Sequence, residues 1–280
     1  MDIFVRNKRY QGEIQAVVLD WAGTAVDFGC MGPAAVFCDV FKDFDIEVTI
    51  EEARQFMGLA KKDHIRNMCA LPTVSSAWEK AHGRLPDESD IDRIYEKTAT
   101  DMTQSIAHHA GVIGGVIDTM ASLRDMDIRV GSSTGYVSEM MDVLVPLAKE
   151  QGYSPDAVVC SSDVPAGRPF PWMCYLNALQ LETYPMEAMV KIGDTITDIE
   201  EGLNAGMWTI GITRTGNELG LSEAQVNGLP GDELQSRLDA IRTRFETCGA
   251  HYVVEQAADI LPVIQEINSR LKDGEIPLRG

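Results

Sequence analysis

The chain has 280 residues, 45% of them hydrophobic and 24% charged, which is typical of a globular protein and allows one large domain or a core with an inserted module. Its formal net charge of −19 argues against the basic surface that nucleic-acid binding requires, so an anionic ligand has to meet local positive charge. No apolar run reaches the roughly 18 residues of a membrane-spanning helix. The charged segment MDIFVRNKRYQGEIQ has no signal-peptide core, so we expect a cytoplasmic protein that binds neither membrane nor nucleic acid.

Short apolar runs alternate with helical stretches through most of the chain. In chain order, QAVVLD, DIRVGSST, DAVVCSSD, AMVKIGD, MWTIGIT and HYVVEQ predict strands. Because the runs are continuously apolar, we expect both faces of each strand to be covered, as in a parallel sheet. Helical spacing in the intervening segments VSEMMDVLVPLAKEQG and PWMCYLNALQ then predicts an α/β fold with a doubly wound, Rossmann-like parallel sheet.

One stretch near the start of the chain breaks this alternation. Amphipathic helical spacing continues through GPAAVFCDVFKDF, IEEARQFMGLAKKDHIRNMCA and DIDRIYEKTATDMTQSIAHH. We therefore predict a helical cap domain over residues 29–109, inserted after the first strand. Residues 1–28 and 110–280 are predicted to form the α/β core domain.

Polar residues stand at the predicted carboxyl ends of strands, where such sheets bind ligands. Asp20 is followed by a turn that contains Gly23, an arrangement that suits a nucleophile surrounded by phosphate-binding N–H groups. Asp20 and Asp194 offer the hard oxygen ligands that Mg²⁺ prefers, so Mg²⁺ is the predicted cofactor. Thr134 can hydrogen-bond a phosphoryl oxygen, and Arg168 carries a charge matched to phosphate. For each aspartate taken singly, capping of the next helix is an alternative explanation.

A second candidate group lies within the predicted cap. Met57, Lys61 and His64 follow i, i+4, i+7 spacing, which predicts that they share one helix face. A lysine desolvated on that face has a lowered pKa, and its neutral amine can act as a nucleophile. From the spacing alone, solvated Lys61 and Lys62 beside a core Met57 are the simpler explanation.

The strand-end motifs, in this order, resemble those of the haloacid dehalogenase superfamily of phosphoryl-transfer enzymes. From about residue 13 to the last helix, the chain resembles one of its families more closely, the phosphonoacetaldehyde hydrolases or phosphonatases. The likeness is carried by DWAGTAVDFGC, MGLAKKDHIR, GSSTGY, DVPAGRPFPWMCY and KIGDTITD with EGLNAGMWTIG. It implies hydrolysis of the P–C bond of phosphonoacetaldehyde, a small phosphonate, to acetaldehyde and phosphate.

The resemblance also implies roles for individual residues. Asp20 matches the family's nucleophile, Lys61 its Schiff-base lysine, and His64 a residue that relays protons near the imine. The Mg²⁺ ligands match Asp20, the backbone carbonyl of Ala22, and Asp194, while Asp198 is expected to orient Asp194 or its loop. The substrate-binding set that we expect comprises Cys30, Met57, Thr134, Gly135, Tyr136 and Arg168. For Cys30 and Tyr136, simple packing remains an alternative.

Ala22 stands where many enzymes with this loop carry a second aspartate. Such an acid protonates the alkoxide that a phosphate monoester expels. Cleavage of a P–C bond expels a carbanion instead, and a protonated imine can accept its electrons as an enamine. Ala22 and Lys61 are therefore complementary. Two departures from the family pattern are Ala25, in place of a hydroxyl residue, and Arg214, whose relation to the site is open.

Two other functions compete with this reading. A phosphatase or phosphomutase acting on a small phosphate ester would not depend on Lys61, and Ala22 weighs against it. A non-catalytic phosphate-binding regulator would not need Asp20 as a nucleophile, although a fold alone never decides function. The resemblance further implies a homodimer formed through the cap, with GPAAVFCDVF as an interface helix.

Overall fold

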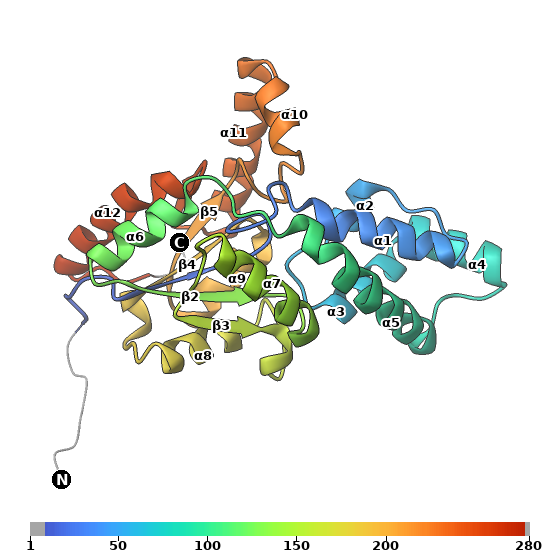
Figure 1. The fold of residues 1–280 in the computed structure, drawn as a ribbon, viewed down its shortest axis with the longest axis horizontal. Helices are drawn as coiled ribbons and strands as arrows, with labels where there is room; N and C mark the ends of the chain where they lie inside the picture. Colours follow the sequence, from blue (N-terminus) through green and yellow to red (C-terminus); the bar gives the residue numbers. More distant parts are fainter. Residues whose placement is uncertain (1–8, 278–280) are drawn as a thin grey trace, which may run out of the picture.

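A parallel six-stranded sheet forms the centre of the computed structural model (Figure 1), which describes residues 9–277, the side chains of residues 103 and 104 excepted. The strand order is β3-β2-β1-β4-β5-β6, and every pairing is parallel. Each run that was expected to be a strand forms one, so the predicted fold class is confirmed. The strands are β1 (Ala16–Leu19), β2 (Arg129–Thr134), β3 (Ala157–Cys160), β4 (Met189–Gly193), β5 (Trp208–Ile212) and β6 (Tyr252–Val254).

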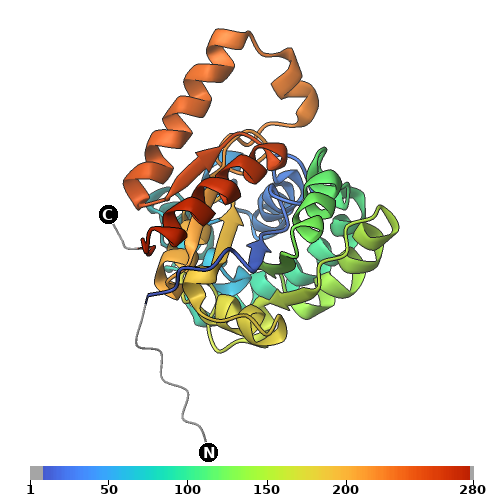
Figure 2. The same ribbon diagram turned by 90° about the vertical axis from the view of Figure 1, so that its left-hand side faces the viewer.

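Helices cover both faces of the sheet, which explains why the strands are continuously apolar. Val17 and Leu19 of β1 pack into one hydrophobic cluster, and Ala16 and Val18 pack into another on the opposite face. The helices of the first face are α6 (Val116–Asp125), α7 (Ser138–Glu150) and α12 (Ile260–Lys272). Those on the other side are α8 (Trp172–Gln180), α9 (Ile196–Ala205) and α11 (Gly231–Cys248). Figure 2 shows that α10 (Glu223–Gly228) and much of α11 project from this body.

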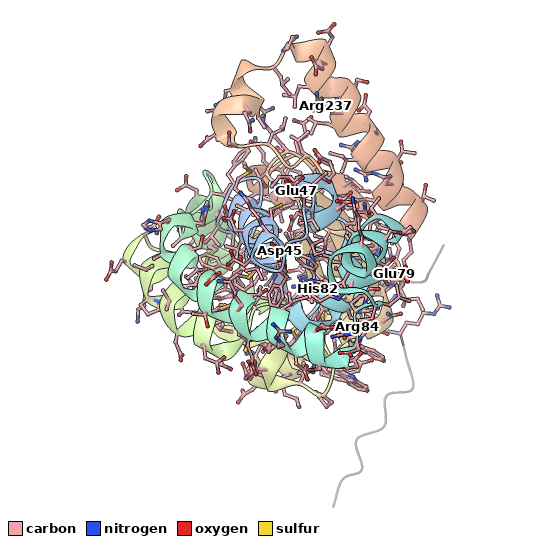
Figure 3. All side chains as sticks on the ribbon, turned by 90° about the vertical axis from the view of Figure 1, so that its right-hand side faces the viewer. Asp45, Glu47, Glu79, His82, Arg84 and Arg237 are labelled. Carbon is pink, nitrogen blue, oxygen red and sulfur yellow. The ribbon has the colours of Figure 1, made fainter. Side chains whose placement is uncertain are left out.

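Residues 31–109 contain helices and no strand. They are α1 (Met31–Asp43), α2 (Ile50–Arg54), α3 (Lys61–Ala70), α4 (Pro72–His82), α5 (Glu88–Ser105) and a 3₁₀ turn over Ile106–His109. Helix α4 falls between two of the segments that show amphipathic spacing. Figure 3 looks onto this group of helices, with Asp45, Glu79 and His82 on the side that faces the viewer. Among residues 9–277, no helix combines the length and apolarity needed to cross a membrane.

The expectation that Met57 and Lys61 lie on one helix was wrong. Helix α2 ends at Arg54, and α3 begins only at Lys61. Between them Gly58 has a φ of 87°, a left-handed conformation that favours glycine. A Cβ at Gly58 would approach the hydroxyl oxygens of Thr197 and Thr195 to 2.3 and 2.6 Å. The turn therefore lies directly against the core, which a continuous helix would not allow.

The order of the strands determines where the site lies. From β1 the chain continues to β2 and β3 on one side, whereas β4, β5 and β6 lie on the other. Ligands bind in parallel sheets at such a reversal, beyond the carboxyl ends of the strands. Asp20 follows β1, and its backbone N–H donates to the carbonyl of Ile192 in β4 at 2.9 Å. The sheet thereby brings Asp20 beside the segment that carries Asp194.

Candidate active site

A small pocket lies where the helical insert meets the carboxyl ends of β1 and β2. Every residue expected to bind the substrate lines it, together with Asp20, Ala22 and Lys61. The lining comprises Asp20, Ala22, Cys30, Pro33, Met57, Gly58, Lys61, Thr134, Gly135, Tyr136, Arg168 and Thr195. Residues from distant parts of the sequence therefore meet in one place.

Three buried carboxylates lie beneath the pocket. One oxygen atom from each of Asp20, Asp194 and Asp198 lies within 4.8 Å of the others. Burial raises the pKa of Asp20 and raises that of Asp194 well above its usual range, and the neighbouring carboxylates add to the shift of Asp194. Close like charges are costly in a dry site unless a cation lies among them. This acidic cluster can hold a metal ion.

Asp194 is fixed by hydrogen bonds and by close backbone packing. Thr24 Oγ1 donates to its Oδ1 at 2.9 Å, and the backbone N–H of Asn217 donates to its Oδ2 at 2.7 Å. Glycines border the carboxylate on two sides, because a Cβ at Gly23 would come within 2.2 Å of Oδ2 and one at Gly216 within 2.4 Å of the Asp194 Cβ. The orientation of this carboxylate is therefore set by the loops around it.

Asp198 has a different task from the other two aspartates. It lies in the first turn of α9 and forms a capping box with Thr195, whose Oγ1 also donates to Asp198 Oδ2 at 2.6 Å. Its Oδ1 accepts from Lys191 Nζ at 2.6 Å and lies 3.1 Å from Arg168 Nη1. These cations lower the pKa of Asp198 against the opposing effect of burial. Because Lys191 and Arg168 already balance its charge, Asp198 is better suited to positioning Arg168 than to binding metal. Its bonds to the backbone N–H and the hydroxyl of Thr195 also hold the loop that follows Asp194.

Arg168 connects the nucleophile candidate to the core. Its side chain is buried, with Nη2 donating to Asp20 Oδ1 at 2.7 Å and to the Ser133 carbonyl at 2.9 Å. Its Nε donates to Glu201 Oε2 at 3.0 Å. Such a multidentate set fixes the plane of a guanidinium and leaves its charge beside the pocket.

Two functional neighbours were not singled out from the sequence. Lys191 on β4 and Glu201 on α9 are both fully buried, with Nζ and Oε2 3.5 Å apart. Lys191 interrupts the apolar run AMVKIGD, and a lysine in a strand covered on both faces needs a buried carboxylate. The position of Lys191 within an apolar run was therefore the signal that could have revealed this buried pair.

Carbonyl groups of the turn between α2 and α3 close the pocket from the insert side. A Cβ at Gly135 would approach the carbonyl oxygen of Leu59 to 2.7 Å and that of Gly58 to 3.1 Å. Arg168 Nη1 also points toward the Gly58 carbonyl, at 3.5 Å. Thr134 is buried at the end of β2, where its Oγ1 accepts from the backbone N–H of Tyr136 at 3.2 Å. Insert and core are thus in close contact around the pocket.

Lys61 occupies the first position of α3, and its side chain is 4% exposed. Its Nζ lies over the ring of Tyr136, 4.8 Å from the centroid, and 5.6 Å from that of Phe37. Burial lowers the pKa of Lys61 to about 8, although Cys30 and Asp20 oppose this shift. The sequence-based alternative of a solvated surface lysine is excluded for Lys61 and applies to Lys62, which pairs with Asp92.

His64 lies one helical turn beyond Lys61 but does not belong to the pocket lining. Its ring stacks on Phe37 with centroids 4.0 Å apart, and Nε2 donates to the Ala53 carbonyl at 2.8 Å. Burial holds the pKa of His64 well below its usual range, so the ring is neutral and Nδ1 carries the lone pair. Among the described residues, nothing hydrogen-bonds to this buried Nδ1. A proton-relaying role for His64 therefore has to use Nδ1.

The remaining candidates border the substrate space. Cys30 caps α1 in a left-handed conformation with a φ of 50°, and burial raises the pKa of its thiol well above the usual range. Tyr136 supplies the ring beneath Lys61. Ala25 is buried in the hydrophobic core and is not part of the pocket lining, whereas Arg214 faces Glu255 at 3.7 Å. Neither departure from the family pattern alters the pocket.

The donor set fits Mg²⁺. Asp20 and Ala22 line the pocket, and the fully buried Asp194, which is not part of the lining, presents a second hard carboxylate oxygen within 4.8 Å of one from Asp20. Asp194 is already oriented by Thr24 and Asn217, the outer hydrogen bonding typical of a metal ligand.

Comparisons with known proteins agree with this site. The family model of haloacid dehalogenase-like hydrolases matches residues 32–212. A phosphonoacetaldehyde hydrolase-like protein of Syntrophobacter fumaroxidans is 55% identical over 277 residues, 99% of this chain and 100% of that protein. A phosphonoacetaldehyde hydrolase of the same organism is 52% identical at the same coverage. The crystal structure of a phosphonoacetaldehyde hydrolase-like protein from Oleispira antarctica is similar with a TM-score of 0.95 and 40% identity, covering 99% of this chain and 100% of that one. The resemblance seen in the motifs is thus confirmed, and the chain belongs to the phosphonoacetaldehyde hydrolases within the haloacid dehalogenase-like hydrolases.

Proposed function

We propose that this chain hydrolyses the P–C bond of phosphonoacetaldehyde to acetaldehyde and phosphate. The observation that carries the proposal is a buried lysine facing a buried aspartate across one small pocket. Lys61 and Asp20 both line that pocket, and the pKa of Lys61 is lowered to about 8. A phosphate-ester hydrolase has no need of a desolvated amine at this point.

In the first half of the proposed reaction, the neutral amine of Lys61 attacks the aldehyde carbon. Water leaves, and the resulting imine takes up a proton. The carbonyl is thereby converted into an electron sink next to the carbon that bears phosphorus. We assign proton transfer on this side of the pocket to His64, whose Nδ1 has no hydrogen-bond partner among the described residues.

In the second half, a carboxylate oxygen of Asp20 attacks phosphorus in line with the P–C bond. The electrons of that bond move into the protonated imine and form an enamine on Lys61. Water hydrolyses the aspartyl phosphate. The enamine is protonated at carbon, and water then releases acetaldehyde and restores the amine.

Charge on the phosphonate is balanced from both sides of the pocket. Arg168 bonds to Asp20 and lies in the pocket lining, close to where phosphonate oxygens are expected. We assign a Mg²⁺ ion to Asp20, Asp194 and the backbone carbonyl of Ala22. When bound, the ion supplies positive charge that orients the phosphonate and offsets its repulsion by Asp20.

The assignment is tested by measuring both products. Incubation with phosphonoacetaldehyde and Mg²⁺ is expected to release acetaldehyde and phosphate in equal amounts. Phosphate release from p-nitrophenyl phosphate that persists in Lys61→Arg, without any acetaldehyde from the phosphonate, would instead establish a phosphatase. Phosphate binding without turnover of either compound would favour a regulator.

The pH dependence of Lys61 reactivity gives a second test. Only the neutral amine reacts, so acetylation of Lys61 by acetic anhydride should rise about tenfold per pH unit below pH 8 and level off above it. Lys62 is an internal control, because its exposed side chain pairs with Asp92 and its pKa is raised from 10.5. Mass spectrometry of the two positions is the measurement. Parallel pH profiles for both lysines would refute a desolvated Lys61.

The proposal includes a cap formed by residues 29–109 on a core formed by residues 1–28 and 110–280. Residues 1–8 and 278–280 of that core lie outside the described part. It also includes a cytoplasmic homodimer formed through the cap. The apolar residues of α1 do not support the interface by themselves, because Phe37, Val40 and Phe41 are buried within the subunit. Sedimentation analysis decides the oligomeric state.

A further inference from the structure

Arg54, the last residue of α2, extends from the insert into the core. Its Nη1 donates to the Gly29 carbonyl at 2.8 Å and to Asn217 Oδ1 at 3.1 Å. Its Nη2 lies 3.2 Å from the sulfur of Met31. One guanidinium thus joins α2 to the first connection between core and insert and to the loop that follows β5.

Asn217 completes a link from Arg54 to Asp194. Its side-chain Nδ2 donates back to the Arg54 carbonyl at 3.3 Å, so the two residues bond reciprocally. Its backbone N–H donates to Asp194 Oδ2 at 2.7 Å. Asn217 is 5% exposed, which shields both interactions from water. The same residue therefore contacts the insert with its side chain and a proposed metal ligand with its backbone.

The loop that carries Asn217 has little room to move independently. Thr215 Oγ1 donates to the Gly23 carbonyl at 2.7 Å, and the Thr215 carbonyl accepts from the Gly29 N–H at 2.7 Å. A Cβ at Gly216 would lie 2.4 Å from the Asp194 Cβ. A displacement of this loop would be passed on to the Asp194 carboxylate.

The hydrogen bonds that the structure describes for Arg54 connect the insert to the core, and they involve no ion pair that opposes separation of the two. Among the described residues, the hydrogen-bond partners of its side chain are a carbonyl, an amide oxygen and a thioether, none of which carries a charge. Within the part of the chain that the structure describes, no group accepts a hydrogen bond from its buried Nε. Because the hydrogen-bond partners of Arg54 carry no charge, opening of the insert for substrate entry and product release does not require an ion pair of Arg54 to be broken.

We infer that Arg54 is a positioning residue that couples closure of the insert over the core to the orientation of Asp194 through Asn217. When the insert opens, Asn217 loses its side-chain partner and the N–H that holds Asp194 Oδ2 is less well fixed. The inference rests on the proposed function for the role of Asp194 as a Mg²⁺ ligand. It adds a residue outside the pocket lining that controls both metal affinity and rate.

The test compares Arg54→Met, Asn217→Ala, the double variant and Arg237→Met. Arg237 is the matched control. It lines, together with Arg54, a second cavity at the surface of the protein, but it belongs to the projecting helix α11 (Figure 3), where it pairs with Glu233. Calorimetric titration with Mg²⁺ alone gives the dissociation constant without any phosphonate. Arg54→Met and Asn217→Ala should each weaken Mg²⁺ binding about tenfold, and Arg237→Met less than twofold.

The double variant distinguishes a coupled pair from two separate defects. If Arg54 acts through Asn217, the double variant binds Mg²⁺ no more weakly than the worse single variant. The inference would be overturned if the loss of Mg²⁺ affinity in the double variant equalled the product of the two single losses. It would also be overturned if Arg54→Met bound Mg²⁺ with unchanged affinity, or if the wild-type protein did not bind Mg²⁺. Arg54→Lys, which keeps the charge but not the two-pronged geometry, should share the defect and guards against misfolding of the methionine variant.

Turnover is measured in parallel, and kcat should fall with Mg²⁺ affinity even at saturating phosphonate. A wild-type protein that binds Mg²⁺ but releases no acetaldehyde would defeat the proposed function. The Mg²⁺ comparison among the variants would still decide the coupling between Arg54 and Asp194.

Discussion

Replacement of Lys61 by arginine is expected to lower the release of acetaldehyde from phosphonoacetaldehyde by about 10³-fold or more. Arginine keeps a positive charge over the Tyr136 and Phe37 rings, where Lys61 Nζ now lies at 4.8 and 5.6 Å from the centroids. Its guanidinium cannot lose a proton at ordinary pH and cannot condense with an aldehyde. The substitution therefore removes the imine while changing packing and charge little.

Borohydride reduction followed by mass spectrometry tests this expectation directly. Wild-type protein mixed with phosphonoacetaldehyde, Mg²⁺ and borohydride should carry a two-carbon adduct on Lys61, and Lys61→Arg should carry none. Lys62, next to Lys61 but exposed and paired with Asp92, should stay unmodified in both proteins. Loss of the adduct with unchanged acetaldehyde release would rule out the imine as an intermediate.

Replacement of Asp20 by asparagine is expected to abolish P–C cleavage, with a loss of at least about 10⁴-fold, because an amide is a poor nucleophile toward phosphorus. Asparagine has the shape of aspartate, and its Oδ1 can still accept the 2.7 Å hydrogen bond from Arg168. Lys61 remains in place above the pocket. The first half of the reaction should therefore survive when the second half cannot proceed.

The adduct separates these two halves. In Asp20→Asn, borohydride should trap the imine with its phosphonate group still attached, so Lys61 carries a phosphonoethyl group. In wild-type protein under turnover, the trapped species should be mainly ethyl. An ethyl adduct in Asp20→Asn would mean that another group cleaves the P–C bond.

The fold could be predicted because the apolar runs and the polar residues that follow them point to the same parallel sheet. Continuously apolar runs of strand length become strands covered on both faces, and Asp20 and Asp194 follow two of them. Since parallel strands end at one edge of a sheet, these aspartates had to come close once β1 and β4 were neighbours. Chain order alone does not reveal that β1 lies between β2 and β4.

Met57, Lys61 and His64 show where local periodicity misleads. Helical spacing placed them on one face, whereas α3 begins at Lys61 and Met57 precedes it in a turn. Met57 and Lys61 still meet in the pocket because Gly58 adopts a φ of 87° and docks on the core. That docking is a contact between segments about 140 residues apart in sequence, such as Thr197 Oγ1 with the Met57 carbonyl at 3.4 Å, and no local pattern encodes it.

Tertiary charge pairs were the least accessible part of the site. The pairing of Glu201 with Arg168 and Lys191 can be inferred only once α9 is known to lie against the end of β4 and Arg168. The bond between Arg54 and Asn217 joins residues 163 positions apart. In a sequence pattern, each of these polar residues is typical of a solvent-exposed position. Only their burial in the structure shows that they belong to the site.

The charged groups beneath the pocket also have a collective property. With every carboxyl group ionised, four carboxylates and two cations leave an excess of two negative charges; the members are Asp20, Asp194, Asp198, Glu201, Arg168 and Lys191. A divalent ion makes the group neutral, whereas a monovalent ion of equal size leaves one charge uncompensated in a poorly screened interior. The group is therefore expected to favour a divalent over a monovalent ion, and residues such as Lys191 that would not touch the ion contribute to that preference.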